Sequence, residues 1–250
     1  MDTQIISLAN QKGGVGKTTT CANLGIGLAR EGKRVLLVDC DPQASLTLSL
    51  GWRKPETLPV TLATLMGRVL QEQPVHAEGV DLIPGSIALS GVEASLDTRQ
   101  NVLKRVLDDC RKDYSHVLLD CMPSLGMMTI NALAAADSVL IPTIPHYLSV
   151  DGLGKLMESI GRMRRGLNRG LRVEGILITM ASRTTYAREI SELLRTQYGT
   201  KIKVFDTVIP HSIRAAECSA EGKSIFAYDP KGKVAQAYNA LTKEVIQHEK

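Results

Sequence analysis

The sequence is poor in aromatic residues. Phe, Trp and Tyr make up 4% of its 250 residues, with one Trp and two Phe. Because 44% of the residues are nonetheless hydrophobic, the core must be built from Ala, Leu, Ile and Val, as is common in parallel α/β sheets. A chain of this length suits one large α/β domain, and we expect a single domain over residues 1–250.

The sequence also lacks a Cys-x-x-Cys pair and any apolar run long enough to cross a membrane. Its five cysteines are Cys21, Cys40, Cys110, Cys121 and Cys218. Their odd number and wide spacing favour buried free thiols in a reducing, cytoplasmic compartment. An iron–sulfur cluster stays open as an alternative, because Cys121 directly follows a candidate metal-binding Asp. We expect no signal peptide, no transmembrane segment and no membrane association.

One glycine-rich stretch carries the strongest chemical signal. It reads Lys12-Gly13-Gly14-Val15-Gly16-Lys17-Thr18-Thr19. An apolar, β-prone stretch at 5–10 precedes it, and apolar residues at helical spacing follow over 20–30, so the glycines fall at a strand-to-helix turn. In such a loop the backbone N–H groups and the start of the helix bind a phosphate. The alternative is a chance glycine-rich turn with two solvated lysines.

The side chains around these glycines predict a nucleoside triphosphate with magnesium. Lys17 is placed to reach the β- and γ-phosphates, and the Thr18 hydroxyl to hold Mg²⁺. The loop residues from Lys12 to Thr19 are therefore the predicted nucleotide-binding residues. A net charge of +4 is compatible with a further anionic partner but does not establish one.

Acidic residues end two of the predicted strands. Asp39 and Asp41 follow an apolar strand at 34–39, and Asp120 follows another at 115–120. A buried strand that delivers a carboxylate beside a phosphate loop supplies the metal shell or positions the attacking water. The alternative for Asp39 and Asp41 is an acidic strand end that caps the next helix, with Pro42 in its first turn.

Strand and helix patterns alternate along the chain. Further strands are expected at 80–84, 138–142, 174–179 and 204–209. Helices are expected at 61–71, 90–110, 126–136, 150–165, 185–198 and 233–248. Apolar strands that alternate with helices predict a mostly parallel central sheet with helices on both faces. The carboxyl ends of such strands form the ligand-binding edge, which would bring the glycine loop and the three aspartates together.

The glycine loop departs from the common P-loop pattern in one informative way. Gln11 stands where that pattern has Gly, and a second lysine, Lys12, follows it. This is the deviant Walker A box, and the sequence here resembles the ParA/MinD family of P-loop ATPases. The resemblance extends over about residues 5–240 and is greatest to short, Soj-like ParA proteins. Pro123-Ser124-Leu125-Gly126 also matches the family, although Met122 replaces a common proline.

The resemblance implies roles for individual residues. Lys12 would act in catalysis by crossing a dimer interface to the partner's nucleotide, beside Lys17 of the same subunit. Asp41 would activate the attacking water, and Asp39 and Asp120 would join Thr18 around Mg²⁺.

The resemblance also implies contacts for the C-terminal third of the chain. Met180 and Pro210, at two strand tips, would pack against the adenine. His211 stands where the family often has Arg. Arg183 and Arg214 would contact DNA, although a solvated basic face is the plainer interpretation of any single cation there.

The function that the resemblance implies is DNA partitioning. An ATP-bridged homodimer would bind DNA nonspecifically and be released when a ParB-like, centromere-binding partner stimulates hydrolysis, in the nucleoid-associated cytoplasm. A MinD-like cycle on a membrane, or the positioning of a protein cargo, is the alternative. The membrane version needs an amphipathic C-terminal helix, and residues 237–250 carry few large apolar side chains. A metabolic P-loop enzyme such as a synthetase is a third option, for which the sequence shows no separate acceptor motif.

Overall fold

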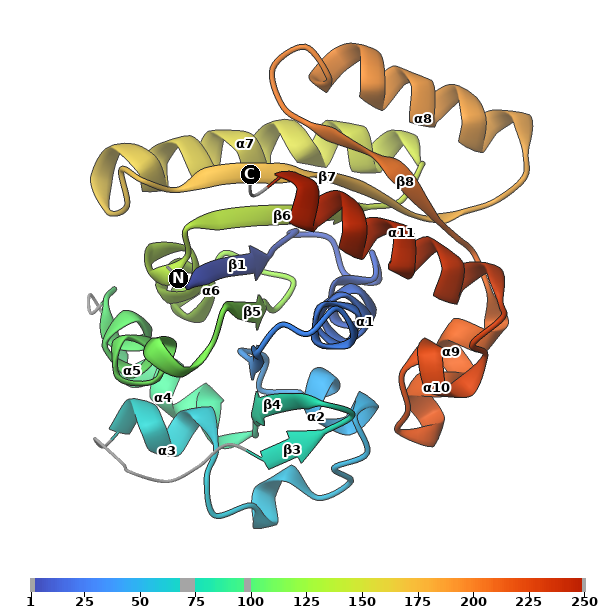
Figure 1. Cartoon of the computed structure of the whole chain (residues 1–250). Helices are drawn as coiled ribbons and strands as arrows, with labels where there is room; N and C mark the ends of the chain where they lie inside the picture. The colour runs from blue at the N-terminus through green and yellow to red at the C-terminus, as the bar shows by residue number, and fades with distance from the viewer. Residues whose placement is uncertain (1–2, 68–74, 97–99, 249–250) are drawn as a thin grey trace.

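An eight-stranded sheet runs through the centre of the molecule (Figure 1). The structure, a computed structural model, describes residues 3–67, 75–96 and 100–248. The strand order is β3-β4-β2-β5-β1-β6-β7-β8, and every neighbouring pair is parallel except β3 with β4. The strands are β1 (Gln4–Leu8), β2 (Val35–Asp39), β3 (Val75–Ala77), β4 (Val80–Ile83), β5 (His116–Asp120), β6 (Ser138–Thr143), β7 (Arg172–Ala181) and β8 (Val204–Pro210).

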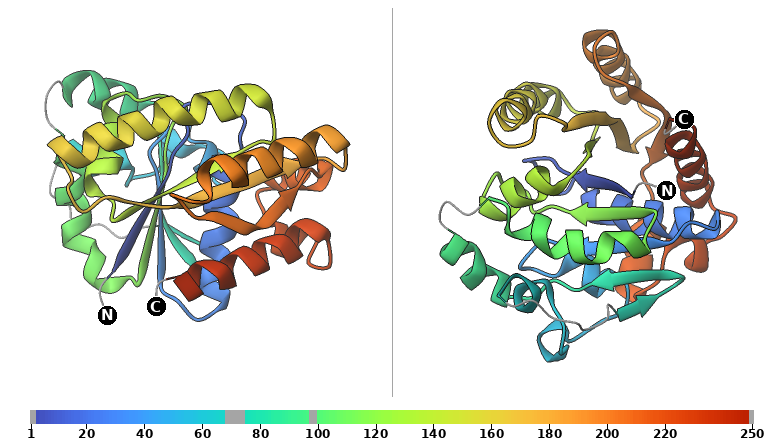
Figure 2. Two further views of the ribbon diagram at one scale, coloured as in Figure 1. Left: turned by 90° about the horizontal axis from the view of Figure 1, so that it is seen from above. Right: turned by 60° about the vertical axis from the view of Figure 1, so that its left-hand side comes forward.

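Helices cover both faces of this sheet, as the two views of Figure 2 show. They are α1 (Lys17–Arg30), α2 (Ser45–Ser49), α3 (Leu62–Gly67), α4 (Ala88–Leu96), α5 (Val102–Cys110), α6 (Met127–Ala135), α7 (Tyr147–Gly166), α8 (Thr185–Tyr198), α9 (Ile213–Glu221), α10 (Ile225–Tyr228) and α11 (Lys233–His248), with short 3₁₀ turns η1 (Pro55–Thr57) and η2 (Arg111–Asp113). Helices α3 to α8 contribute to the core on one face, and α1, α2, α9, α10 and α11 to the core on the other.

Successive strand residues point into opposite cores. In β1, Ile5 belongs to the cluster beneath α3 to α8, and Ile6 to the cluster beneath α1 and α11. Leu119 and Leu118 of β5 divide in the same way. Because both faces are covered, these strands carry apolar residues at consecutive positions. The predicted sheet, mostly parallel with helices on both faces, is confirmed.

Several elements differ from the sequence prediction. The helix expected at 90–110 is two helices, α4 and α5, separated at Asn101, which lies just before α5. The helix expected at 61–71 is α3, and residues 68–71 lie outside the described part of the chain. Three short helices (α2, α9 and α10) and the antiparallel strand β3 were not predicted, because elements of three to nine residues show too little periodicity.

The first and last regular elements are both tied to distant parts of the chain. β1 lies between β5 and β6, with Gln4 opposite His116 and Ile6 opposite Ser138. Helix α11 packs on α1 and β8. The buried hydroxyls of Thr20 on α1 and Tyr238 on α11 lie 3.2 Å apart. The start of α1 is therefore held against both the sheet and the closing helix.

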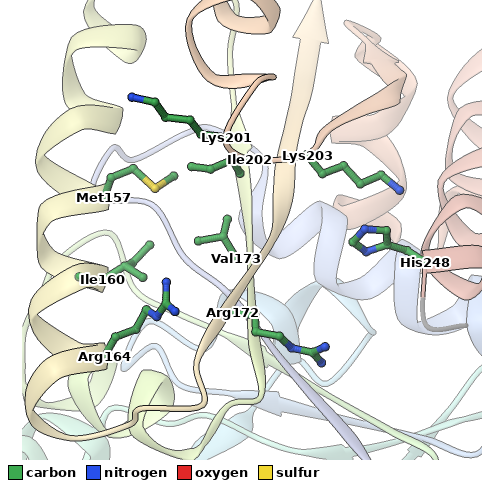
Figure 3. A pocket seen from close by; sticks show the side chains of 10 residues that line it. Met157, Ile160, Arg164, Arg172, Val173, Lys201, Ile202, Lys203 and His248 are labelled. Carbon is green, nitrogen blue, oxygen red and sulfur yellow. The ribbon is translucent and has the colours of Figure 1, made fainter.

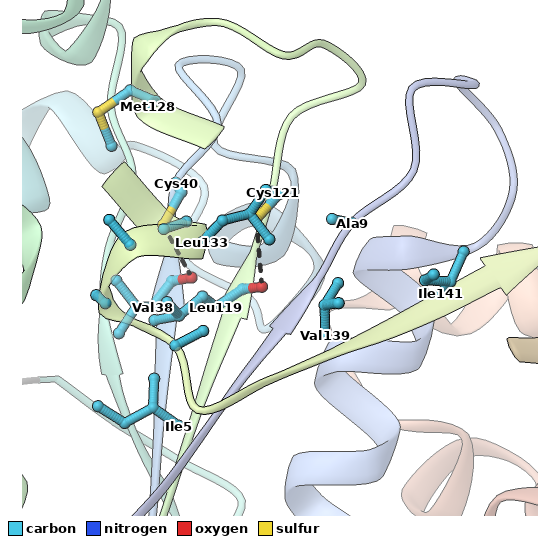
Figure 4. Packing of buried hydrophobic residues seen from close by; sticks show 14 of the residues in the cluster. Ile5, Ala9, Val38, Cys40, Leu119, Cys121, Met128, Leu133, Val139 and Ile141 are labelled. Atoms are coloured by element: carbon cyan, nitrogen blue, oxygen red, sulfur yellow. Dashed lines mark hydrogen bonds between the residues drawn. The ribbon is translucent and has the colours of Figure 1, made fainter. Parts of the chain in front are cut away.

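Cys40 and Cys121 lie in the core beneath α3 to α8, as expected (Figure 4). Cys21, Cys40, Cys121 and Cys218 are buried free thiols, and the side chain of Cys110 lies outside the described residues. Burial raises the pKa of Cys121 to about 12, so this thiol is neutral at physiological pH. The iron–sulfur alternative gains no support, because no group of three or more His, Cys, Asp or Glu side chains in the described residues could hold a metal ion.

Candidate active site

The loop from Lys12 to Thr19 joins β1 to α1 at the carboxyl edge of the sheet. Gly14 and Gly16 have φ angles of 68° and 81°, a left-handed conformation that would strain any residue with a Cβ. No side chain caps the start of α1, which begins at Lys17 directly after Gly16. The first N–H groups of this helix are thus available to an anion, which fits the predicted phosphate loop.

Both lysines of the loop have partners within the chain. The Lys17 ammonium donates to the carbonyl oxygen of Lys12 at 3.1 Å. Lys17 is only 7% exposed, and burial lowers its pKa, although the nearby Asp120 carboxylate opposes that shift. The Lys12 ammonium donates to the hydroxyl of Ser149, in the first turn of α7, at 3.1 Å. A triphosphate on the loop would compete for both ammonium groups.

Asn10 fixes the entry to this loop. Its side-chain oxygen accepts the backbone N–H of Lys12 at 3.0 Å, and its amide nitrogen donates to the carbonyl of Pro142 at 2.8 Å. The loop is thereby tied to β6. The tip of β7 is tied to the loop as well, because the Thr179 hydroxyl lies 2.8 Å from the carbonyl oxygen of Val15. Sequence patterns did not predict the bonds from Asn10 to Pro142 and from Thr179 to Val15, because these pairs lie 132 and 164 positions apart along the chain.

Asp39 and Asp120 end β2 and β5 at paired positions. Asp39 is fully buried and accepts three hydrogen bonds, from the Thr47 N–H at 2.9 Å, the Thr47 hydroxyl at 2.7 Å and the Asp41 N–H at 3.2 Å. Burial nonetheless raises the pKa of Asp39 to about 6. Gly85 completes this corner, since a Cβ there would lie 2.8 Å from the Asp39 carboxyl carbon.

Asp120 is buried to the same degree but has no such support. It is 1% exposed, and neither of its carboxylate oxygens has a hydrogen-bond partner among the described residues. Burial and the Asp39 carboxylate raise the pKa of Asp120 well above its usual range, and the nearby Thr18 and Lys17 offset only part of that rise. An unpartnered buried carboxylate costs free energy unless it binds a cation or a donor. It therefore fits the metal role predicted for it.

Asp41 lies in the turn between β2 and α2. Its side-chain oxygen accepts the backbone N–H of Gln43 at 2.9 Å, and the residue is half-buried. Ala44, the last residue of this turn before α2, has a φ angle of 52°, which is uncommon for a residue with a Cβ. Asp41 is close enough to raise the pKa of Lys17 by its charge. The structure thus brings Asp41 beside the loop, with one oxygen not used in the turn.

The two residues predicted to contact the base are placed differently from each other. Met180 has a left-handed backbone, with a φ angle of 49°, and its terminal methyl group lies 3.6 Å from the position of a Cβ at Gly16. It therefore lies directly against the phosphate loop. Pro210 pairs with Ala181 one strand further out, and the N–H of His211 donates to Ala181 at 3.1 Å.

The two predicted DNA contacts lie outside this site. Arg183 is exposed in the turn between β7 and α8. Arg214 is exposed on α9, where its guanidinium lies 3.6 Å from the Asp229 carboxylate. An ion pair reduces the charge that Arg214 can offer to a phosphate, so these two residues are not equivalent.

Metal-binding clusters and membrane-spanning helices can both be assessed for the described residues. In residues 3–67, 75–96 and 100–248, no group of three or more His, Cys, Asp or Glu side chains could hold a metal ion by itself. None of the helices in these ranges is long and apolar enough to cross a membrane.

Comparisons with known proteins agree with this geometry. A protein-family model described as an AAA domain matches residues 3–173. The chain is 41% identical over 249 residues to the sporulation initiation inhibitor protein Soj of Bacillus subtilis, covering 97% of this chain and 98% of that protein. It is 43% identical over 242 residues to the chromosome-partitioning ATPase Soj of Thermus thermophilus, covering 96% and 94%.

A solved structure extends the likeness to three dimensions. It is described as cobyrinic acid a,c-diamide synthase from Mycobacterium smegmatis with bound ATP analogue and magnesium. It matches with a TM-score of 0.86 and 35% identity, covering 99% of this chain and 96% of that one. From the near-complete coverage by relatives around 40% identical, we conclude that the chain belongs to the ParA/Soj family of chromosome-partitioning ATPases.

Proposed function

We propose that this protein is a magnesium-dependent ATPase whose ATP-bound dimer binds DNA and moves or positions a DNA cargo. The observation that carries the proposal is the buried, unpartnered carboxylate of Asp120 beside the uncapped start of α1. An N-terminal helix end suits phosphate, and a desolvated carboxylate suits Mg²⁺. The identity to the Soj proteins supports the partitioning role.

In this proposal the whole chain works as one ATPase unit. The triphosphate of ATP would lie on Gly13 to Thr19, where the Lys17 ammonium would exchange the Lys12 carbonyl for the β- and γ-phosphates. Thr18, Asp39 and Asp120 would hold Mg²⁺, and the chemistry it would supply is neutralisation of phosphate charge. Asp41 would orient the attacking water. Met180 and Pro210 line the side of the site where the adenine would pack.

Lys12 gives the dimer its proposed catalytic role. It would exchange the Ser149 hydroxyl of its own subunit for the phosphates bound to the other. The surface next to Ser149 suits a second copy, because Tyr147 and Leu148 are 63% and 64% exposed. A cation supplied in trans can be worth roughly 10³–10⁵ in rate, by analogy with arginine fingers, so basal turnover should be slow.

DNA and a stimulating protein are the proposed partners. The dimer would hold duplex DNA through cations such as Arg183 and Arg214, without reading sequence. A ParB-like protein bound to a centromere-like site would complete the ATPase site and release the dimer. The proposed location is the nucleoid-associated cytoplasm.

DNA binding in different nucleotide states tests the proposal. Anisotropy of a labelled random-sequence duplex would be measured with ATP, with ADP and without nucleotide, at two salt concentrations. Binding that requires ATP is expected. If about four phosphate contacts form per bound unit, the log–log salt slope should lie near −3.6. Absence of DNA binding in every state would contradict the DNA role while leaving the ATPase intact.

A membrane-cycling function is the second candidate, and the closing helix decides between the two. Helix α11 buries Val234, Tyr238 and Leu241 against the rest of the molecule, so its apolar face is already used. Membrane binding by an amphipathic helix needs that face free. Co-sedimentation with anionic liposomes in the presence of ATP would favour the membrane function.

A further inference from the structure

A groove lined by both cations and aliphatic side chains lies at the amino edge of the sheet, opposite the phosphate loop. It consists of two adjoining hollows, of about 510 and 360 Å³, which share Gly161 and Arg164 in their walls. The second half of α7 forms one side, and the start of β7 and the turn before β8 form the other (Figure 3). We define the basic groove by Arg164, Arg165, Arg169, Arg172 and Lys201.

The five cations that define the basic groove have no ion-pair partner in the described part of the chain. All five residues are exposed, and none makes a salt bridge there. Within residues 3–67, 75–96 and 100–248, no acidic side chain lines either hollow. Unpaired like charges on one surface create a positive potential that attracts anions.

The floor of the second hollow is aliphatic. Met157, Val173 and Ile202 line it and are half-buried, so each leaves part of its apolar surface uncovered. In the view of Figure 3 these side chains lie between Lys201 and Arg164, so the cations flank an apolar centre. An apolar centre with a polar rim, rich in Arg and Met, is typical of a surface that binds another protein.

Neighbouring cations on the β8 side are already neutralised by acidic side chains of the chain itself. Lys203 also lines the groove but lies 3.6 Å from Glu244, and His248 lies 3.0 Å from Glu174. In Figure 3 the side chain of Lys203 points away from that of Lys201, which extends toward α7. The positive charge left for a ligand is therefore on the α7 side of the groove.

Helix stability explains only part of this charge. Arg164 and Arg165 end α7, where a cation complements the helix dipole. Arg169, Arg172 and Lys201 lie outside any helix, so the dipole does not account for them. A ligand of opposite charge accounts for all five positions.

The turn that carries Arg169 is held rigidly. The side-chain amide of Asn168 donates to the carbonyl oxygens of Leu133, Ala134 and Ala136 at 3.0, 3.3 and 2.7 Å. The cations next to this turn are thus displayed on a fixed surface, which lowers the entropy cost of binding a partner.

The combination of charge and aliphatic floor separates a protein segment from other anions. A phosphate backbone gains little from aliphatic contacts, and single-stranded nucleic acids are usually held by bases stacked on aromatic rings. No Phe, Tyr or Trp is found among the described lining residues. A second copy of this chain would bring the same cations to the groove and be repelled. A peptide with acidic and aliphatic side chains uses both features.

We propose that the basic groove docks an acidic, amphipathic segment of a partner protein. Its carboxylates would pair with the guanidinium groups, which bind carboxylates through two parallel hydrogen bonds, and its aliphatic side chains would cover Met157, Val173 and Ile202. Docking there would tether the ATPase to that partner while its nucleotide edge remains free.

This partner is distinct from the protein proposed to stimulate hydrolysis. Along β7, the eight residue steps from Arg172 to Met180 span roughly 26 Å, so a segment in the groove does not reach the phosphate loop. It also leaves Arg183 and Arg214 free for DNA. The docking proposal goes beyond the proposed function and does not depend on it.

The test uses the full chain and a short labelled peptide of alternating Glu and Leu, whose binding is followed by anisotropy. A peptide of alternating Glu and Ser carries the same charge without the aliphatic side chains. Arg165→Gln/Arg169→Gln removes two groove cations. Lys54→Gln/Lys112→Gln is the matched control, because these lysines are exposed, make no ion pair with the described residues and lie outside the groove.

A third variant tests the floor. Met157→Gln keeps the length of the side chain and makes the centre of the groove polar. ATP binding by each variant confirms that it folds, since all these positions lie away from the phosphate loop.

The groove variant should bind the Glu–Leu peptide about tenfold more weakly than the control does, because two ion pairs worth about threefold each are lost. The Glu–Ser peptide should bind the wild type about tenfold more weakly than the Glu–Leu peptide. Met157→Gln should weaken binding of the Glu–Leu peptide only. Equal binding by the groove variant and the control, or equal affinity for the two peptides, would overturn the proposal.

A second arm uses a random-sequence DNA duplex in the presence of ATP. The groove variant should lose no more affinity for the duplex than the control does. A selective tenfold loss of DNA affinity in the groove variant would assign the groove to DNA and overturn the proposal. ATP turnover is recorded alongside, so a wild type that hydrolyses no ATP but binds the Glu–Leu peptide through the groove would refute the proposed function and support the docking site.

Discussion

The strands β2 and β5 each end in a buried aspartate, and the two carboxylates differ in their hydrogen bonding. Asp39 and Asp120 are paired across the strands, and both are buried. The first accepts three hydrogen bonds, two of them from Thr47, and the second accepts none from the described residues. The two residues therefore share their type, their burial and their position at the end of a strand, and they differ in the hydrogen-bond donors around them.

This difference in hydrogen bonding separates a carboxylate that stabilises the fold, Asp39, from one that is left to bind a ligand, Asp120. The Asp39 carboxylate organises the turn that follows it, because Thr47 also accepts the N–H of Gly85 at 3.0 Å and so links three segments. The Asp120 carboxylate accepts no hydrogen bond from the described residues, and a bound cation or donor would offset the free energy cost of burying it. Of the two carboxylates, Asp120 is the one we expect to matter chiefly for chemistry, and Asp39 the one we expect to matter for both chemistry and stability.

Replacing Asp120 should give the largest effect. In Asp120→Asn, ATP turnover should fall at least about hundredfold, because roughly 3 kcal/mol of metal-dependent stabilisation is lost. The free energy of unfolding of the nucleotide-free protein should stay equal or rise, since a desolvated carboxylate is removed. Turnover and urea denaturation would be measured together, with the exposed Asp206→Asn as control. Turnover within tenfold of the wild type would refute the role of Asp120.

Lys12 extends the comparison to a cation, because it donates to Ser149 in its own subunit and would have to break that bond in the dimer. Lys12→Ala should abolish ATP-dependent dimerisation while the monomer still binds ATP. Ser149→Ala should instead favour the dimer by about thirtyfold, because each of the two subunits loses a hydrogen bond worth about 1 kcal/mol that holds Lys12 in its own subunit. Sedimentation with ATP would measure both. A Lys12→Ala variant that still dimerises normally would contradict the trans role.

Removing a hydrogen-bond donor from Asp39 should leave it less well satisfied, as Asp120 is. Thr47→Val deletes the hydroxyl that donates to Asp39 and accepts from Gly85, and should lower the free energy of unfolding by about 2–3 kcal/mol. Thr57→Val, which removes an exposed hydroxyl from a surface turn, should change it by less than about 0.5 kcal/mol. Equal stability of the two variants would show that the Asp39 network is not structural.

Replacing Glu244, a hydrogen-bonded carboxylate outside the site, should give the smallest effect on the free energy of unfolding. Glu244 accepts the N–H groups of Asp206 and Thr207 at 2.9 and 3.1 Å, and these bonds lower its pKa, although burial opposes them. A lowered pKa stabilises the fold above the unfolded value near 4.5, and the gain is lost as the pH falls through the folded value.

Glu244→Gln tests this pH dependence. At pH 7 the variant should be less stable than the wild type by about 1 kcal/mol. Urea denaturation from pH 7 to pH 3 should show the difference shrinking below about pH 4.5, as the wild-type carboxyl becomes protonated. A difference that stays constant over this range would mean that the charge of Glu244 contributes nothing to stability.

Local patterns in the sequence predicted the sheet, the phosphate loop and the acidic strand ends, because each depends on neighbours within a few residues. The support of Asp39 by Thr47 was missed, since α2 is only five residues long. The bond from Lys12 to Ser149 joins residues 137 positions apart, and no periodicity reports such a contact. Arg183 and Arg214 are the same residue type and cannot be distinguished in the sequence. The structure shows that Arg214 forms an ion pair with Asp229.

The position of β1 between β5 and β6 has a consequence for biosynthesis. The strand that carries the phosphate loop is synthesised before its partners at His116 and Ser138, which follow more than 100 residues later. At about 5–20 residues per second, β1 is complete roughly 5–25 s before both neighbouring strands, and α1 precedes its partner Tyr238 by longer still. The sheet around the phosphate loop can therefore close only after more than half of the printed sequence has been synthesised.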